Sequence, residues 1–382
     1  IMAGEPENLQ AALVAVQPGT GRVLAYYGGD SGVGTDYAGV YLDENGDLMG
    51  SGYHPPGSSF KVYTLAAALK ANFSLRSYWR WNPYTMPDGR DDIRNASTCG
   101  NLPAGDERPC SLLQSTVSSL NVPFYQITLS VGAGNVLAMA RDAGIRWMWN
   151  DDREPFDLTA QPDMGAVVPS QFGPHLGIGQ YPVTVLDHAN GMATMAAAGL
   201  PATVHFVERV TKGDAIIYGE KLDPDRPRIL TPQQANDLTY ALSQVDSADV
   251  NIGWDTAGKT GTWEYNNTSE NAHAWMVGFS RRIAAAVWVG NRDAEQPLRN
   301  ARGEKVWGSG LPATIWRQFM TDATAAMNEP KVNTKFNPPN YVGNTMPPGA
   351  VPSPRPTGRD RDRDRDRDRP TTPPGRDSDD AE

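Results

Sequence analysis

A proline-proline-glycine turn at residues 55–57 leads directly into an apolar segment rich in alanine and leucine, residues 62–69. The turn marks the start of this segment, which is typical of a helix. Ser58 is therefore expected in the first helical turn, with Lys61 three residues later on the same face and close enough to touch it. The rest of the chain is expected to be organised around this stretch.

This pair of residues has a chemical use. A serine hydroxyl is a poor nucleophile until a neighbouring group accepts its proton. Lys61 can accept that proton if burial and nearby positive charge lower the pKa of its amine. The N–H groups at the start of a helix add positive potential near the reacting oxygen. A single Ser-x-x-Lys match is nevertheless common by chance, and a helix start with an incidental lysine explains an isolated match equally well.

Two later motifs change that balance. Ser119-Leu120-Asn121 follows 61 residues after the serine (58 to 119), and Lys259-Thr260-Gly261-Thr262 begins another 140 residues on (119 to 259). The ordered set Ser-x-x-Lys, Ser-x-Asn and Lys-Thr-Gly occurs in penicillin-binding proteins and serine β-lactamases. Over residues 8–325 the chain resembles the transpeptidase domain of a bifunctional class A penicillin-binding protein, including that family's opening hairpin at residues 9–25.

The resemblance implies a reaction and a role for each residue. Ser58 is the nucleophile that attacks a peptidoglycan stem peptide ending in D-Ala-D-Ala, and Lys61 accepts its proton. Ser119 relays a proton to the leaving D-alanine, and Asn121 holds a substrate amide. Lys259 raises the local positive potential, which helps to keep Lys61 neutral. An amine from a neighbouring stem peptide then takes the acyl group, whereas a β-lactam acylates the serine and stays bound.

The third motif is expected to lie on a strand beside the cleft, where an extended substrate docks as an added strand. Gly261 permits close approach of the substrate backbone. Lys259, Thr260 and Thr262 present groups that suit a terminal carboxylate. By the resemblance, the N–H groups of Ser58 and Thr262 form the oxyanion hole.

The same residues also match a phosphate-binding loop. Residues 253–260 have the form G-x-x-x-x-G-K-T. Such a loop needs a buried apolar strand before it and a helix after it. Residues 247–252 make a poor strand, and residues 261–267 are unfavourable for a helix, so we reject the nucleotide-binding interpretation.

Local patterns predict a mixed α+β fold, in which helices flank one antiparallel sheet assembled from distant segments and a helical subdomain is present. Thr231-Pro232 is a good helix start, and Asn121-Val122-Pro123 indicates a break between two helices. The predicted hairpin spans residues 9–29, and a strand pair spans 203–210 and 214–221. Further strands are predicted at 256–263, 272–280 and 283–290, and helices at 112–131, 134–143, 183–198, 231–245 and 311–327.

We expect three regions: a linker remnant at residues 1–8, a transpeptidase domain at 9–330, and a tail at 331–382. The tail is proline-rich, and residues 359–369 alternate strictly between arginine and aspartate, so it is expected to be disordered and to act as a spacer. The net charge of −10 argues against nucleic-acid binding. The resemblance implies an upstream membrane anchor and glycosyltransferase domain in the parent chain, location on the outer face of the bacterial cell membrane, and cell-wall proteins as further candidate partners.

Cys99 and Cys110 are the two cysteines of the chain, and they lie in a segment rich in glycine and proline. A cytosolic protein would keep them as free thiols, whereas the extracytoplasmic location implied by the resemblance favours a disulfide. Neither they nor the five histidines have metal-ligand spacing, so we expect no metal and no cofactor.

Three alternatives stay open. A D,D-carboxypeptidase or a β-lactamase on the same fold transfers the acyl group to water, and a penicillin-binding sensor or scaffold does not turn over at all. A β-lactamase usually needs a positioned glutamate for deacylation. Glu154, Glu208 and Glu220 lie between the second and third motifs, but none sits in a recognisable pattern. Leu120 stands where the β-lactamase motif has aspartate, which favours the penicillin-binding enzymes.

Overall fold

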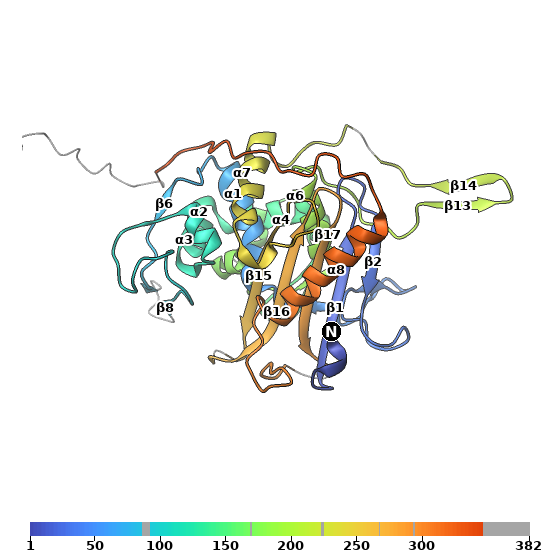
Figure 1. Cartoon of the computed structure of the whole chain (residues 1–382), viewed down its shortest axis with the longest axis horizontal. Coiled ribbons are helices and arrows are strands. Elements are labelled where there is room, and N and C mark those ends of the chain that lie inside the picture. The colour runs from blue at the N-terminus through green and yellow to red at the C-terminus, as the bar shows by residue number, and fades with distance from the viewer. Residues whose placement is uncertain (86–91, 169, 223–224, 267, 293–294, 347–382) are drawn as a thin grey trace, which may run out of the picture. The chain divides into compact units, whose positions relative to one another are not determined.

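The computed structural model describes residues 1–85, 92–168, 170–222, 225–266, 268–292 and 295–346 (Figure 1). The Arg-Asp repeat, with the rest of the predicted tail from residue 347, lies outside the described residues. The α-helices are α1 (Lys61–Lys70), α2 (Leu112–Val117), α3 (Asn121–Val131), α4 (Ala133–Ala143), α5 (Met164–Val167), α6 (Val185–Ala196), α7 (Pro232–Ser243) and α8 (Leu311–Met327). Short 3-10 turns are η1 (Met2–Gly4), η2 (Gly57–Phe60), η3 (Leu158–Ala160), η4 (Pro174–Ile178) and η5 (Asp246–Ala248).

The strands form one large sheet and several small ones. They are β1 (Leu9–Val16), β2 (Val23–Tyr27), β3 (Tyr41–Leu42), β4 (Leu48–Met49), β5 (Tyr53–His54), β6 (Tyr78–Trp79), β7 (Tyr84–Thr85), β8 (Asp92–Ile93), β9 (Cys110–Ser111), β10 (Trp147–Trp149), β11 (Pro155–Asp157), β12 (Val183–Thr184), β13 (Arg209–Lys212), β14 (Ala215–Gly219), β15 (Ala257–Glu264), β16 (Asn271–Phe279) and β17 (Ala284–Asn291).

The large sheet is antiparallel and has the strand order β15-β16-β17-β1-β2. Strand β1 pairs with β17 along its whole length, from Leu9 opposite Asn291 to Val16 opposite Ala284. Segments from the two ends of the domain therefore lie side by side, which confirms the predicted antiparallel sheet built from distant parts of the chain.

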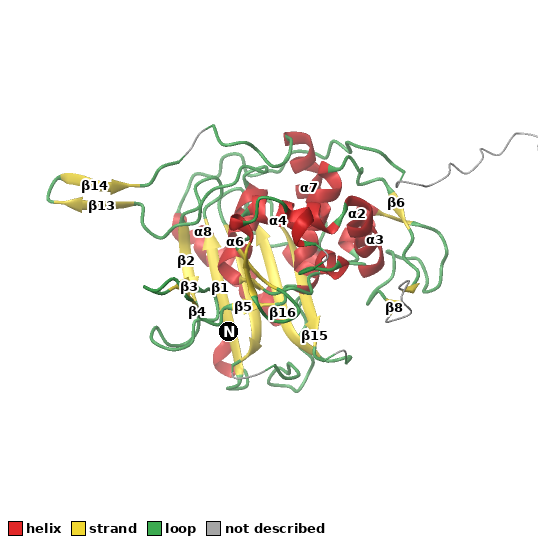
Figure 2. Ribbon diagram, turned by 180° about the vertical axis from the view of Figure 1, so that it is seen from behind, coloured by secondary structure: helices red, strands yellow, loops and turns green. Residues whose placement is uncertain are grey.

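Helices cover both faces of this sheet. In β1, Val14 packs in the core that contains α6, whereas Leu13 packs in the core that contains α8. This division follows from the alternation of side chains along a strand. Figure 1 shows α8 crossing one face, and Figure 2 shows α6 and α4 on the other. Because both faces are covered, β1 and β16 are buried throughout, and their sequences are mostly apolar rather than alternating.

Helix α1 lies at the centre of the helical layer. All of its residues except Lys70 are buried, and it packs against α3, α4 and α7. A helix that is apolar on all sides is typically surrounded by other elements. The turn η2, which precedes α1, contacts the edge strand β15. The start of the central helix therefore meets the edge of the sheet.

Most predicted elements are confirmed, including the helix start at Thr231-Pro232 and the break between α2 and α3. The predicted strand at 203–210 was wrong in its first part, because His205 pairs with Arg22 beside β2 and the hairpin strand begins only at Arg209. The helix predicted from residue 183 begins at Val185, because the two residues before it form β12, which pairs with β5 and β10. The small sheet β11-β10-β12-β5 was not predicted.

Residues 331–346, assigned to the tail from sequence, lie against the domain. The buried carboxylate of Asp237 on α7 accepts backbone N–H groups from Asn340 at 2.5 Å, Tyr341 at 2.7 Å and Val342 at 2.8 Å. A buried carboxylate needs such donors. The segment is therefore anchored to α7 despite its prolines.

Candidate active site

Ser58 lies in η2, which continues directly into α1. The preceding Gly57 has a φ of +52°, in the left-handed region that suits glycine, and its N–H donates to Gly179 O at 2.9 Å. A Cβ on Gly57 would lie only 2.3 Å from Thr262 O and 3.0 Å from Thr262 N. This glycine therefore lets the turn that carries Ser58 come into direct backbone contact with β15.

Ser119 follows the C-terminal end of α2 with a φ of +55°, which is uncommon for a residue other than glycine. Its N–H donates to Thr116 O at 3.1 Å, and Leu120 N–H donates to Ser115 O at 2.9 Å, the pattern of a Schellman helix end. Such backbone strain is concentrated at functional sites. The turn directs the carbonyl and the hydroxyl of Ser119 toward two different lysines.

The buried amine of Lys61 makes three polar contacts. Its Nζ lies 2.9 Å from Ser58 Oγ, 2.7 Å from Ser119 O and 2.7 Å from Asn121 Oδ1. The last two atoms can only accept hydrogen bonds, so they use both N–H groups of a neutral amine. The lone pair of the amine then faces the Ser58 hydroxyl, which is the geometry that a general base requires.

The two lysines influence each other's ionisation. Burial, together with the nearby charge of Lys259, lowers the pKa of Lys61 well below its ordinary value of 10.5. Burial lowers the pKa of Lys259 to about 7. Two buried ammonium groups this close would repel each other strongly. The arrangement therefore favours a neutral Lys61 beside a Lys259 that changes charge near neutral pH.

Lys259 connects the third motif to the second. Its Nζ donates to Ser119 Oγ at 2.7 Å. A Cβ on Gly261 would lie 2.2 Å from Pro56 O, so β15 passes directly against the serine turn. Because β15 is at the edge of the large sheet, the backbone on its outer side is not paired within that sheet. An extended peptide can therefore be added there.

The remaining residues of the third motif lie on the same strand. Thr260 and Thr262 are half-buried, and Thr262 Oγ1 accepts a hydrogen bond from Gly308 N–H at 3.2 Å. The backbone N of Thr262 lies beside Gly57, the neighbour of Ser58. The two N–H groups predicted to form an oxyanion hole therefore belong to adjacent backbone segments.

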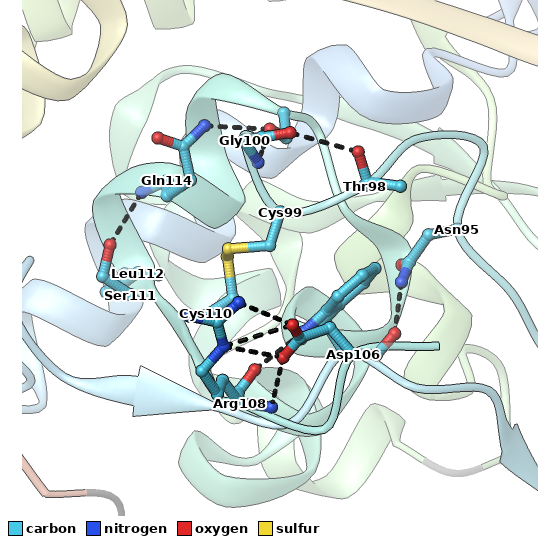
Figure 3. The surroundings of a disulfide bond; sticks show 12 residues. Asn95, Thr98, Cys99, Gly100, Asp106, Arg108, Cys110, Ser111, Leu112 and Gln114 are labelled. Atoms are coloured by element: carbon cyan, nitrogen blue, oxygen red, sulfur yellow. Dashed lines mark hydrogen bonds and ion pairs between the residues drawn. A yellow bond between two sulfur atoms is a disulfide. The ribbon is translucent and has the colours of Figure 1, made fainter. Parts of the chain in front are cut away.

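The segment just before the disulfide-linked cysteines supports the second motif. Asn121 Nδ2 donates to Arg94 O at 2.9 Å, which leaves the amide oxygen facing Lys61. Asn95 Oδ1 accepts the N–H of the residue after Asn121 at 2.8 Å. A disulfide joins Cys99 and Cys110 a few residues further along the chain (Figure 3). The contacts of Arg94 and Asn95 therefore fix the orientation of the Asn121 amide.

The structure brings Ser58, Lys61, Ser119, Asn121 and Lys259 together through direct contacts. The sequence analysis did not identify two supporting residues. Asn95 accepts a backbone hydrogen bond from the residue after the second motif, and the centre of the Phe124 ring lies 5.5 Å from Lys61 Nζ. No local pattern marks them, because their contacts arise only when separate segments fold together.

The structure bears on the phosphate-binding loop and on the three glutamates considered for deacylation. Lys259 and Thr260 lie inside strand β15 rather than before a helix, so the context of a phosphate-binding loop is missing. Glu154 pairs with Asn150, and Glu220 accepts hydrogen bonds from Arg22 and His205. Glu208 forms an ion pair with Arg22. Among the described residues, none of these glutamates contacts Ser58 or Lys61.

Within the ranges given above, no three or more His, Cys, Asp or Glu side chains gather as they would around a metal ion. None of the helices in this part of the chain has the length and apolar character needed to cross a membrane.

Residues 11–315 match the family model described as the penicillin binding protein transpeptidase domain. Penicillin-binding protein 1A of Mycolicibacterium smegmatis is 31% identical over 361 residues, covering 92% of this chain and 42% of that protein. The chain thus spans less than half the length of this relative. The structure of PonA1 from Mycobacterium tuberculosis in complex with penicillin V is similar, with a TM-score of 0.71, 27% identity, and coverage of 91% of this chain and 86% of that one. The penicillin G acyl-enzyme complex of penicillin-binding protein A from the same organism is also similar. Its TM-score is 0.58 at 26% identity, and the match covers 82% of this chain and 74% of that one.

Proposed function

Because this chain belongs to the family of penicillin-binding protein transpeptidase domains, we propose that it is a peptidoglycan D,D-transpeptidase acting through an acyl-enzyme on Ser58. The observation that carries the proposal is the 2.9 Å contact between Ser58 Oγ and the buried amine of Lys61. Penicillin-binding protein A of Mycobacterium tuberculosis supports it, since its solved acyl-enzyme complexes show that it forms covalent adducts with β-lactams.

The first half of the reaction forms the acyl-enzyme. Ser58 Oγ attacks the carbonyl carbon between the two D-alanines while its proton passes to Lys61 Nζ. The carbonyl oxygen becomes an oxyanion, which the N–H groups of Ser58 and Thr262 stabilise. When the carbonyl re-forms, the C–N bond breaks and the leaving D-alanine takes a proton from the Ser119 hydroxyl. Lys259 replaces that proton across the 2.7 Å contact.

The second half reverses these proton movements. The amine of a neighbouring stem peptide attacks the acyl carbon and loses its proton through Ser119 to Lys259. The ester C–O bond breaks, and Lys61 returns its proton to Ser58 Oγ. Both lysines regain their starting charge, so the cycle needs no cofactor. The Asn121 amide and strand β15, with Thr260 and Gly261, would hold the substrate backbone in both halves.

The affinity for a β-lactam carboxylate is expected to fall as the pH rises above about 7. Lys259 is charged below its pKa of about 7 and neutral above it, and only the charged form attracts a carboxylate. The bound carboxylate raises the pKa of Lys259 in the complex, so the dissociation constant before acylation should rise by up to about tenfold per pH unit above 7. Stopped-flow titration of a penicillin between about pH 6 and 9 measures this constant, and the penicillin methyl ester is the control. A constant that does not change with pH, or one that changes equally for the ester, would contradict the assignment.

The position of the chain in a longer protein is also part of the proposal. Its relative penicillin-binding protein 1A is more than twice as long, which supports a parent chain with an upstream glycosyltransferase domain and membrane anchor. We place the domain on the outer face of the bacterial cell membrane, where the Cys99–Cys110 disulfide would persist. Residues 1–8 would then be a linker, and the tail a spacer that could contact cell-wall proteins.

The test is product analysis with a stem peptide and an acceptor amine. The expected result is that the cross-linked product forms faster than the stem peptide shortened by one D-alanine, which is the product of acyl transfer to water. Predominant hydrolysis of the stem peptide would instead indicate a carboxypeptidase, and rapid hydrolysis of penicillin a β-lactamase. Acylation by penicillin without any turnover of stem peptide would indicate a sensor or scaffold.

A further inference from the structure

A buried series of hydrogen-bonded side chains, separate from the contacts around Lys61, ends on the turn that carries the nucleophile. It consists of Tyr63 on α1, His188 on α6 and Ser59, all fully buried, and the reaction above uses none of them. His188 Nε2 lies 2.8 Å from Ser59 Oγ, and His188 Nδ1 lies 2.8 Å from Tyr63 Oη. Ser59 Oγ lies 2.8 Å from Pro56 O. This hydrogen-bonded series thus runs from the central helix α1 through α6 to the turn that carries Ser58.

The direction of each hydrogen bond follows from the contact between Ser59 Oγ and Pro56 O. Pro56 O can only accept, so the single hydroxyl hydrogen of Ser59 points to it. Ser59 Oγ must then accept from His188, which places the imidazole hydrogen on Nε2. A neutral imidazole has one N–H, so Nδ1 accepts from Tyr63. Burial agrees with this assignment, because it lowers the pKa of His188 to about 3 and keeps the ring neutral.

Other contacts hold the same turn and the same chain in place. Trp275 Nε1 donates to Pro55 O at 2.8 Å, and the Trp275 ring packs edge-on to His188. A Cβ on Gly191 would lie 2.1 Å from Tyr63 Oη, so the glycine in α6 makes room for the tyrosine hydroxyl. Glycine is unfavourable inside a helix compared with alanine. Its presence at this point is therefore explained by the contact between Tyr63 and His188.

We propose that His188 and Ser59 are positioning residues for the acyl transfer, because they hold the turn at Pro56 in the geometry that brings Ser58 Oγ to Lys61 Nζ. The inference rests on the proposed function and deepens it. The peptide of Ser59 is continuous with that of Ser58, so fixing the Ser59 hydroxyl and Pro56 O limits the movement of the nucleophile. A displacement of about 1 Å at a reacting atom can slow a reaction about a hundredfold.

The test compares variants of His188 in acylation by a labelled penicillin. The variant His188→Leu removes both ring nitrogens, and we expect the acylation rate constant to fall about tenfold to a hundredfold, while the dissociation constant before acylation stays within about twofold. In His188→Gln, the amide supplies a donor and an acceptor, so most of the rate should return. The matched control is Thr194→Val, which removes a buried hydrogen bond from α6 to Ala143 O and should keep the wild-type rate.

A His188→Leu rate within about twofold of wild type would overturn the positioning role, as would an equal loss in Thr194→Val. If the leucine variant does not fold, a glutamine variant that folds but acylates no faster than about a hundredth of wild type would overturn it, and one near the wild-type rate would support it. Nitrogen-15 NMR of the wild-type chain between about pH 6 and 8 gives a readout independent of activity. The Nε2–H tautomer of His188 is expected. An Nδ1–H or doubly protonated ring would refute the hydrogen-bond directions from Tyr63 through His188 to Ser59. A wild-type chain that penicillin does not acylate would defeat the proposed function, whereas the NMR result would still decide the hydrogen-bond chain.

Discussion

Replacing Lys61 with alanine is expected to slow acylation by a labelled penicillin about a thousandfold. General acid–base groups contribute about 10²–10⁴-fold to such steps, and the Lys61 amine lies 2.9 Å from the hydroxyl whose proton must leave. The substitution also removes the hydrogen-bond partner of Ser119 O and Asn121 Oδ1. The loss should therefore lie in the upper half of that range. Stopped-flow measurement of the acylation rate constant tests it.

The matched control is Lys70→Ala at the other end of the same helix. Lys70 is the one exposed residue of α1, and the substitution should leave acylation unchanged. A Lys61→Ala rate within about tenfold of wild type would mean that another group accepts the proton from Ser58. The assignment of the base would then be wrong, even if the nucleophile were right.

Replacing Gly261 with alanine is expected to lower the acylation rate about a hundredfold and the free energy of unfolding by about 1–3 kcal/mol. The new Cβ would lie 2.2 Å from Pro56 O and 2.9 Å from Ser59 N, and both of these are backbone atoms that cannot rotate away. Strand β15 must therefore move from the serine turn, and it takes Lys259 and Thr262 with it. Acylation kinetics and urea unfolding measure the two effects.

Gly219→Ala provides the comparison for this substitution. Gly219 lies on β14, and the nearest atom to an added Cβ is Ile216 Cγ2 at 3.9 Å. This variant should keep the wild-type acylation rate and stability. If Gly261→Ala also kept both, β15 would not pack against the nucleophile turn as described.

The sequence predicts the local parts of the site well, for physical reasons. A Pro-Pro-Gly turn before an apolar segment determines the start of α1, and three residues of helix determine that Ser58 and Lys61 meet. The antiparallel sheet follows from alternating and continuous apolar segments at both ends of the chain. The prediction that the three motifs converge came from their resemblance to a known set, because spacing alone does not bring residues 58, 119 and 259 together.

The parts that sequence did not predict depend on tertiary contacts. His188 lies in an apolar helix, and nothing near it in sequence indicates that its ring reaches Ser59. Asn95 is one of many polar residues in a loop, and only the folded chain places its side chain against the second motif. The left-handed backbone of Ser119 is equally hidden, because the helix end that requires it would ordinarily favour glycine.

The most direct measurement of the central claim is the mass of the intact chain after reaction with a labelled penicillin, followed by peptide mapping. If segments distant in the sequence surround one activated hydroxyl, each chain gains a single adduct, and that adduct maps to Ser58 and is absent from Ser58→Ala. An adduct on another residue, or one that persists in Ser58→Ala, would contradict the account.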